Sequence, residues 1–250
     1  MKTAVEEKPI LFSSPMVRAI LAGRKTMTRR VVDLKHVLTP DQKKLGFEQC
    51  DDPKYFRASL LVKGVPRLTV PVRHPLDGNL SWDECDGNCL YARWEVGDRL
   101  WVRENYSQSS CWTEPDLDCV AFQADGAIYR DEVDRLGERL EYSIRDLERD
   151  HPAVKWAKWK PSIHLPRKFC RIALEVTDVR LERLQQISEE DAQAEGFSGL
   201  KHAPEVGGWI DPPSFEFRRL WETLNGPRGF GWDANPWVWV VLFKRLEATS

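Results

Sequence analysis

Hydrophobic residues along this chain gather mostly in short runs separated by polar residues, glycine and proline, which is typical of many short strands. The strongest of these signals spans residues 169–184, where Ile172, Leu174 and Val176 recur at every second position. The other predicted strands are residues 10–12, 27–32, 90–93, 100–104, 118–123 and 236–243. We therefore expect a fold whose core consists mainly of strands.

Apolar residues return to helical spacing in four segments, which are residues 13–23, 130–150, 186–197 and 215–224. In the first, Pro15 suits the opening turn, and Gly23 can end the helix because glycine tolerates a positive φ. In the third, Ser188 is an N-cap and Gly196 ends the helix. We expect the 130–150 helix to be an addition to the fold with a solvated outer face.

Two regions lack this regularity. Residues 33–88 predict an elaborated loop with one or two β-hairpins, and residues 155–167 hold two prolines that predict a rigid extended loop. Many short strands, a few short helices and long loops favour an α+β fold, built as a small β-barrel with peripheral helices. At 250 residues we expect one domain, with insertions at about residues 33–88 and 126–152.

Charge and hydropathy exclude two classes of protein. Lys and Arg total 37 while Asp and Glu total 39, so the chain cannot coat nucleic acid through bulk positive charge. The charged N-terminus lacks an apolar signal core and no run is long enough to cross a bilayer, so we expect a cytoplasmic protein without a membrane partner. Eleven tryptophans predict that several line the core or a pocket for a flat ring.

The six cysteines are spaced irregularly, and we expect them to be reduced thiols. Cys85 and Cys89 form a C-x3-C pair, to which Cys50, His36 or His74 would have to add the missing zinc ligands. Because no second matched pair accompanies the first, we expect no metal and no other cofactor.

Two isolated polar residues are candidates for proton transfer. His164 lies in the proline-rich loop with no evident partner, so a structural hydrogen bond is the simpler interpretation. Glu195 lies at the C-terminal end of the 186–197 helix, where the helix dipole disfavours a carboxylate. An acid placed against that preference is either irrelevant surface or held there for a functional reason.

The clearest chemical pattern lies where the first predicted helix joins the next strand. Residues 8–32 contain no acid and six bases, which are Lys8, Arg18, Arg24, Lys25, Arg29 and Arg30. A basic cluster around a turn suits a polyanion or a polar ligand that forms hydrogen bonds. The alternative is an ordinary solvated surface.

Residues 10–30, with the central run Gly23-Arg24-Lys25-Thr26-Met27-Thr28, resemble the ASCH domain, a family of PUA-like β-barrels. Three further motifs are similar to those of larger, often phage- or prophage-borne members, and they are residues 97–104, 159–164 and 231–237. The resemblance covers most of the chain outside residues 33–88 and 130–150. It implies the PUA-like barrel.

A small bacterial member of this family is an amidohydrolase that removes the acetyl group from N4-acetylcytidine, and its catalytic positions match Lys25, Thr28 and Glu195 here. The resemblance therefore implies a metal-independent amidohydrolase for N4-acylated cytosine nucleosides. Thr28 would be the nucleophile, Lys25 the proton acceptor and Glu195 the proton donor. The residues expected to contact the substrate are Phe12, Ser13, Arg24, Arg29, Trp101 and Glu104. Of these, Phe12 or Trp101 would stack on the base.

Threonine is a poor nucleophile, so this mechanism needs Lys25 neutral. Free lysine titrates at about 10.4, and the site must lower that pKa by roughly three units through burial or neighbouring cations. A Glu195 carboxylate would hold Lys25 charged, so we expect the two to titrate as a coupled pair and the rate to show a bell-shaped pH profile.

Two other functions are compatible with the same residues. PUA-like barrels commonly bind RNA, and the basic residues between Arg18 and Arg30 would then contact phosphates. A ribonuclease would use Lys25 and Glu195 for proton transfer. The amidohydrolase is the preferred interpretation, and it depends on folding that brings Lys25, Thr28 and Glu195 into one pocket shaped for a planar base.

Overall fold

The computed structural model describes residues 7–33, 48–49, 57–60, 66–70, 72–73, 80–81, 89–110, 119–130, 142–143, 155–201 and 207–246. The chain forms two compact units, each made of separate stretches of sequence. The first unit takes in Met1–Thr26, Gly97–Glu175 and Phe243–Ser250, and the second takes in Met27–Val96 and Val176–Leu242.

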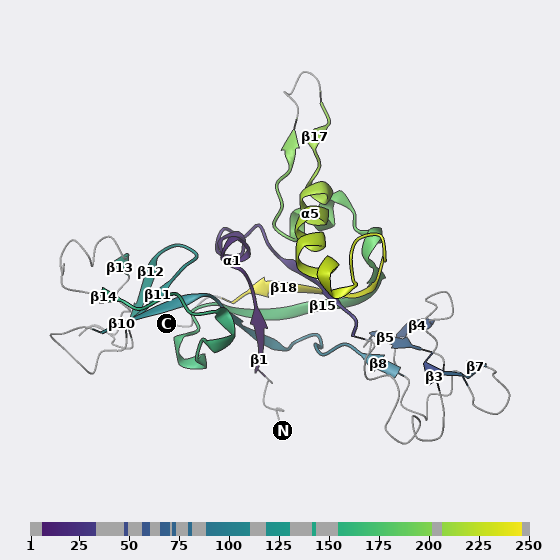
Figure 1. Cartoon of the computed structure of the whole chain (residues 1–250), viewed down its shortest axis with the longest axis horizontal. Coiled ribbons are helices and arrows are strands. Elements are labelled where there is room, and N and C mark those ends of the chain that lie inside the picture. Colours follow the sequence, from purple (N-terminus) through teal and green to yellow (C-terminus); the bar gives the residue numbers. More distant parts are fainter. Residues whose placement is uncertain are drawn as a thin grey trace. The chain divides into compact units, whose positions relative to one another are not determined.

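One five-stranded sheet has the strand order β1, β9, β15, β18, β2. The bounds of these strands are Glu7–Leu11, Arg99–Arg103, Ala173–Arg183, Trp237–Arg245 and Met27–Val31, in the same order. β1 pairs with β9 in parallel, whereas β15 with β9 and β18 with β2 are antiparallel. The two long strands β15 and β18, side by side in Figure 1, each contain residues of both units.

In the first unit, helix α1 (Ser14–Leu21) follows β1 and buries Val17, Ala19 and Ile20. A second five-stranded sheet, wholly antiparallel, has the order β13, β12, β11, β10, β14. Its strands are Tyr142–Ser143, Ala127–Arg130, Cys119–Phe122, Tyr106–Ser110 and Lys155–Trp156. Two 3-10 turns, η3 (Ser162–His164) and η4 (Arg167–Phe169), adjoin a core cluster of Tyr106, Val120, Phe122, Leu165 and Phe169.

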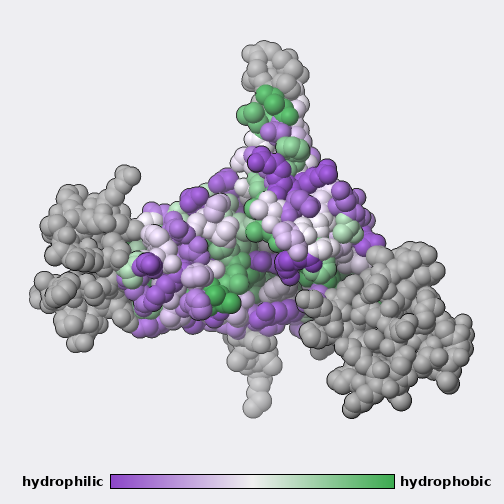
Figure 2. Space-filling model, in the orientation of Figure 1, coloured by the Kyte–Doolittle hydropathy of each residue, from purple (hydrophilic) through white to green (hydrophobic). Residues whose placement is uncertain are grey.

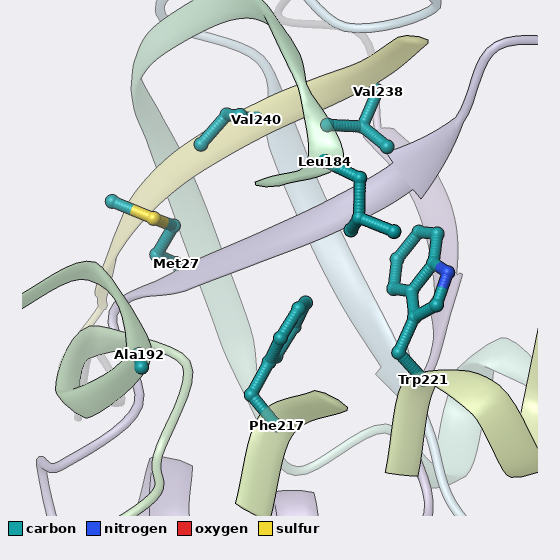
Figure 3. Close-up of a cluster of buried hydrophobic side chains, with 7 residues drawn as sticks. All are labelled: Met27, Leu184, Ala192, Phe217, Trp221, Val238 and Val240. Atoms are coloured by element: carbon teal, nitrogen blue, oxygen red, sulfur yellow. The ribbon is translucent and has the colours of Figure 1, made fainter. Parts of the chain in front are cut away.

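The second unit carries helices α4 (Glu189–Ala194) and α5 (Pro213–Asn225), and the 3-10 turns η5 (Leu184–Gln186) and η6 (Gly226–Arg228). Phe217 and Trp221, four residues apart on α5, point toward β2 and β18 in Figure 3 because helical spacing puts them on one face. The buried members of this cluster are Met27, Leu184, Ala192, Phe217, Trp221, Val238 and Val240. This core joins α4 and α5 to one face of β2.

The remaining strands of the second unit are short. Two three-stranded sheets have the orders β3-β6-β7 and β4-β5-β8. Their strands are Glu48–Gln49, Val72–Arg73, Leu80–Ser81, Arg57–Leu60, Pro66–Thr69 and Cys89–Tyr91. β16 (Leu200–Lys201) and β17 (Trp209–Asp211) form a hairpin that exposes Leu200 and Ile210, at 54% and 53%, and Figure 2 shows apolar residues on it.

The α+β prediction is confirmed, because sheets make up most of the core and the described helices are few and short. No closed barrel is present among the residues that the structure describes. The predicted strands correspond to β1, β2, β8, β9, β11, β15 and β18, and β4 with β5 is a hairpin inside residues 33–88. None of the helices in the described part has the length and hydrophobicity that crossing a membrane requires.

The predicted helix over residues 130–150 is wrong where the structure describes it. Arg130 ends β12, and Tyr142 and Ser143 form β13, which pairs with Ala127 and Ile128 of β12. Pairing with a neighbouring strand overrides the local apolar spacing that favoured a helix. The rest of that segment lies outside the described residues, as does most of residues 33–88.

Candidate functional site

Lys25 follows a sharp helix end. Gly23 has a φ of 70°, a conformation that a side chain would strain, and the backbone N–H groups of Arg24 and Lys25 both donate to the carbonyl of Ala19. The Lys25 side chain is 2% exposed, and its Nζ lies 5.5 Å from the ring centroid of Phe12. Phe12 is itself buried. The predicted base is therefore an interior amine of the first unit, next to an aromatic ring.

Thr28 lies on β2, 3% exposed and paired with Val241 of β18. Side chains alternate along a strand, so Met27 and Arg29 share one face of β2 while Thr28 and Arg30 share the other. The Nη1 of Arg29 donates to the sulfur of Met27 at 3.2 Å, which confirms the first of these faces. Arg30 was not among the predicted site residues, although alternation alone could have placed it beside Thr28.

The guanidinium of Arg29 is the centre of an ion-pair cluster in the second unit. Its side chain has no exposed surface. Its Nη2 pairs with Asp191 of α4 and lies 3.3 Å from Oε2 of Glu182 on β15. Its Nη1 lies 3.8 Å from Oε1 of Glu195, and the ring of Phe217 covers it at 6.0 Å. A fully buried cation is tolerated here because carboxylates surround it.

Glu195 is the C-cap residue of α4 and is 4% exposed. The helix that carries it begins as predicted, because the Ser188 hydroxyl accepts a hydrogen bond from the Asp191 N–H at 3.1 Å. A carboxylate at a helix C-terminus costs about 0.3–1 kcal/mol. Arg29 offsets that cost. Burial lowers the pKa of Arg30, and the Glu195 carboxylate partly raises it, so Glu195 acts on both arginines that follow Thr28.

Four of the six predicted substrate contacts lie in the first unit outside the Lys25–Phe12 contact. Ser13 is the exposed N-cap residue of α1 and makes no side-chain cap bond, and Arg24 is exposed. Trp101 is 8% exposed, with the guanidiniums of Arg103 and Arg167 at 4.5 and 5.8 Å from its ring centroid. Its ring thus packs against arginines. The fourth predicted substrate contact in the first unit is Glu104.

Glu104 is 1% exposed and is held by Arg171, whose Nε and Nη2 donate to its two oxygens at 2.9 and 2.8 Å. Arg171 also donates to Asp125 and covers the ring of Phe122 at 4.2 Å. Burial raises the pKa of Glu104, which the bonds from Arg171 only partly offset. Burial lowers the pKa of Arg171, but both carboxylates outweigh it and raise that pKa. This cluster links the segment after β9, the turn after β11 and the segment before β15 in the first unit.

The basic stretch of residues 8–32 is not one open surface. Lys8 pairs with Asp98 at 2.7 Å, and Arg18 donates to the Ala124 carbonyl at 2.9 Å. Lys25 and Arg29 are buried, so the solvated-surface interpretation is wrong for these two.

His164 is exposed in η3 and donates through its backbone N–H to the Pro161 carbonyl. In the described part of the chain, no group of three metal-ligating side chains occurs, and Cys89 and Cys170 are free thiols. The remaining residues of the possible zinc site, Cys50, Cys85, His36 and His74, lie outside the described residues.

The structure thus brings Arg29 to Glu195 within the second unit, where Thr28 also lies, and places Lys25 with Phe12 in the first. Glu182 and Asp191 could not be predicted as partners of Arg29 because they lie 153 and 162 residues away in the chain. Comparison of the chain with family models, curated proteins and solved structures finds no match.

Proposed function

We propose that this chain is a metal-independent amidohydrolase of the ASCH family that removes acyl groups from N4-acylated cytosine nucleosides such as N4-acetylcytidine. Thr28 is the nucleophile, Lys25 the proton acceptor and Glu195 the proton donor. The closed PUA-like barrel belongs to the same proposal, and the five-stranded sheet from β1 to β2 is its support.

The observation that carries the proposal is the burial of all three catalytic candidates. Lysine and glutamate are almost never fully buried without a specific reason. In the described part of the chain, the buried polar or charged side chains are Lys25, Thr28, Arg29, Thr69, Glu104, Ser107, Glu195 and Asn225. Three of these eight are Lys25, Thr28 and Glu195, the residues that the sequence predicted to be catalytic. Residues of an ordinary solvated surface would not be buried in this way.

The burial of Lys25 supports its proposed role as a proton acceptor. Removing an ammonium from water costs several kcal/mol, which favours the neutral amine. The Phe12 ring favours the charged form, but a cation–π contact contributes only about 0.5–2 kcal/mol. Of these two effects desolvation is the larger. A neutral amine has the lone pair that deprotonation of a threonine hydroxyl requires.

The proposed reaction balances in two steps. The Thr28 hydroxyl attacks the acyl carbon and gives its proton to Lys25. The C–N bond then breaks while Glu195 gives its proton to N4, releasing the cytosine nucleoside and leaving an acyl ester on Thr28. Water attacks that ester and gives a proton to the Glu195 carboxylate, while Thr28 recovers its proton from Lys25 and the free acid leaves.

The leaving group makes a weak nucleophile sufficient. The departing nitrogen belongs to a delocalised pyrimidine, which accepts charge better than an alkylamine does. Protonation by Glu195 completes the departure.

The structure gives less support to RNA binding through the basic residues between Arg18 and Arg30. Phosphate binding needs accessible cations. Among these basic residues, Lys25 and Arg29 are buried, and Arg18 donates to the Ala124 carbonyl of the first unit.

The test is incubation of the protein with N4-acetylcytidine while the ultraviolet spectrum is followed for cytidine. We expect turnover, and we expect its loss in Lys25→Ala, Thr28→Ala and Glu195→Gln variants. Absence of turnover together with salt-sensitive RNA binding would instead favour a binding module. RNA cleavage that the same variants abolish would favour a ribonuclease.

A further inference from the structure

The two terminal nitrogens of the Arg29 guanidinium have different carboxylate partners. Its Nη2 is fixed by Asp191 and Glu182, which come from α4 and β15. Its Nη1 is the group that approaches Glu195, at 3.8 Å. One planar guanidinium therefore links β2, β15 and both ends of α4.

We propose that Arg29 is a positioning residue that fixes the carboxyl group of Glu195 for proton transfer. This inference rests on the proposed function, and it assigns to Arg29 a role other than the substrate contact expected from the sequence. The Arg29 side chain has no exposed surface, and its Nη1 lies 3.8 Å from Glu195.

Glu195 needs such a partner because of its place in α4. A C-cap residue lies where the helix ends, and the dipole there repels a carboxylate. The packing of Phe217 over the guanidinium and the contact with Met27 restrict Arg29 to one position. The position of Glu195 is thereby tied to β2, the strand that carries Thr28.

The fork of an arginine is essential to this arrangement. It presents donors in two directions from a rigid plane, so that anchoring one nitrogen orients the other. A lysine at position 29 keeps the charge but offers a single point, which either the Asp191–Glu182 side or the Glu195 side can occupy. Arg29→Lys is thus the informative substitution, because it separates geometry from charge.

Arg180 supplies a matched control. Its Nη1 lies 3.1 Å from Glu182 and its Nη2 lies 3.6 Å from Asp191, so it bridges the same two carboxylates from a side chain that is 40% exposed. Arg180→Gln removes a cation from the same cluster at a position whose ion pairs go to Asp178, Glu182 and Asp191.

The experiment measures kcat and KM for N4-acetylcytidine in Arg29→Lys, Arg180→Gln, Glu195→Gln and the Arg29→Lys/Glu195→Gln double variant. Misplacing a catalytic group by about 1 Å costs on the order of 100-fold, so we expect Arg29→Lys to lower kcat by about 10- to 100-fold with KM nearly unchanged. Arg180→Gln should stay near the wild-type kcat, and Arg29→Lys should add little to Glu195→Gln. Equal losses at Arg29 and Arg180, or an Arg29→Lys loss that multiplies fully with that of Glu195→Gln, would overturn the inference.

A wild-type protein that is folded but inactive would refute the proposed function and leave the contact itself to be tested. Urea unfolding of the wild type, Arg29→Lys, Glu195→Gln and their double variant then forms a double-mutant cycle, in which non-additive changes in unfolding free energy support the Arg29–Glu195 contact and additive changes refute it. Should Arg29→Lys fail to fold, Asp191→Asn loosens Arg29 from its anchored side, and it should lower kcat with KM unchanged. An Asp191→Asn variant with wild-type kcat would then refute the inference.

Discussion

Arg171 and Glu104 form a two-bonded ion pair, with Nε and Nη2 of the arginine 2.9 and 2.8 Å from the two carboxylate oxygens. Glu104 is 1% exposed, so this carboxylate depends on its partner for the bonds that water would otherwise supply. The sequence assigned Glu104 to the substrate. Its bonds give it a structural function in the first unit.

Arg171→Met should therefore destabilise the protein strongly. Breaking a buried pair leaves an uncompensated charge and costs about 3–5 kcal/mol, measured as the free energy of unfolding in urea. Adding Glu104→Gln should recover part of that loss. Lys244→Met breaks the exposed Lys244–Glu175 pair at 3.1 Å and should cost less than about 1 kcal/mol. Equal losses in the two single variants would contradict this account.

The stability contributed by Asp125 should depend on pH. Burial alone would raise the pKa of Asp125, but hydrogen bonds from Arg171 and the Ala127 N–H outweigh burial and hold it below its ordinary 3.8. The folded state thus prefers the ionised form, so this contribution is complete above pH 3.8 and is lost as the pH falls through the folded pKa. The difference in unfolding free energy between wild type and Asp125→Asn should shrink in that range. A difference that stays constant with pH would refute the assignment.

Ser188→Ala should weaken α4, the helix that carries Glu195. The Ser188 hydroxyl accepts the Asp191 N–H at 3.1 Å, and losing such a cap costs about 1 kcal/mol of unfolding free energy. Gln193→Ala changes an exposed position of the same helix. Like most surface substitutions, it should change the unfolding free energy by less than about 0.5 kcal/mol. A cap variant as stable as the Gln193 variant would show that the bond contributes nothing.

Glu195→Gln should lower kcat by about 10²- to 10⁴-fold, the usual contribution of a general acid or base. Glu190→Gln, exposed on the same helix, should retain wild-type kcat. Both are measured as cytidine release from N4-acetylcytidine. Retention of activity in Glu195→Gln would remove Glu195 from the mechanism.

Local signals predicted the elements that frame the candidate residues. The cap at Ser188 and the glycines that follow α1 and α4 are determined within a few residues, and Gly23 and Gly196 adopt φ of 70° and 102°. Side-chain alternation along β9 also puts Trp101 and Arg103 on one face, where the guanidinium lies 4.5 Å from the ring centroid. These features depend on backbone conformation and side-chain period, which a sequence displays directly.

Contacts between residues far apart in the chain could not be predicted from such local signals. Arg29 pairs with residues more than 150 positions away, so sequence gave no reason to separate it from an exposed arginine such as Arg24. The strand at Tyr142–Ser143 depends on β12, and the apolar spacing around it suggested a helix instead. Burial was one of the two routes by which the predicted chemistry lowers the pKa of Lys25, and this side chain is 2% exposed.

The most direct test of the central claim is the rate of N4-acetylcytidine deacetylation by Thr28→Val beside Thr26→Val. Valine nearly preserves the shape of threonine while removing the hydroxyl, and Thr26 is an exposed threonine two residues away. We predict that Thr28→Val, folded as judged by its urea midpoint, loses turnover by more than about 10³-fold, as loss of a nucleophile does, while Thr26→Val keeps the wild-type rate. Deacetylation by Thr28→Val at the wild-type rate, or none by the folded wild-type protein, would contradict the account.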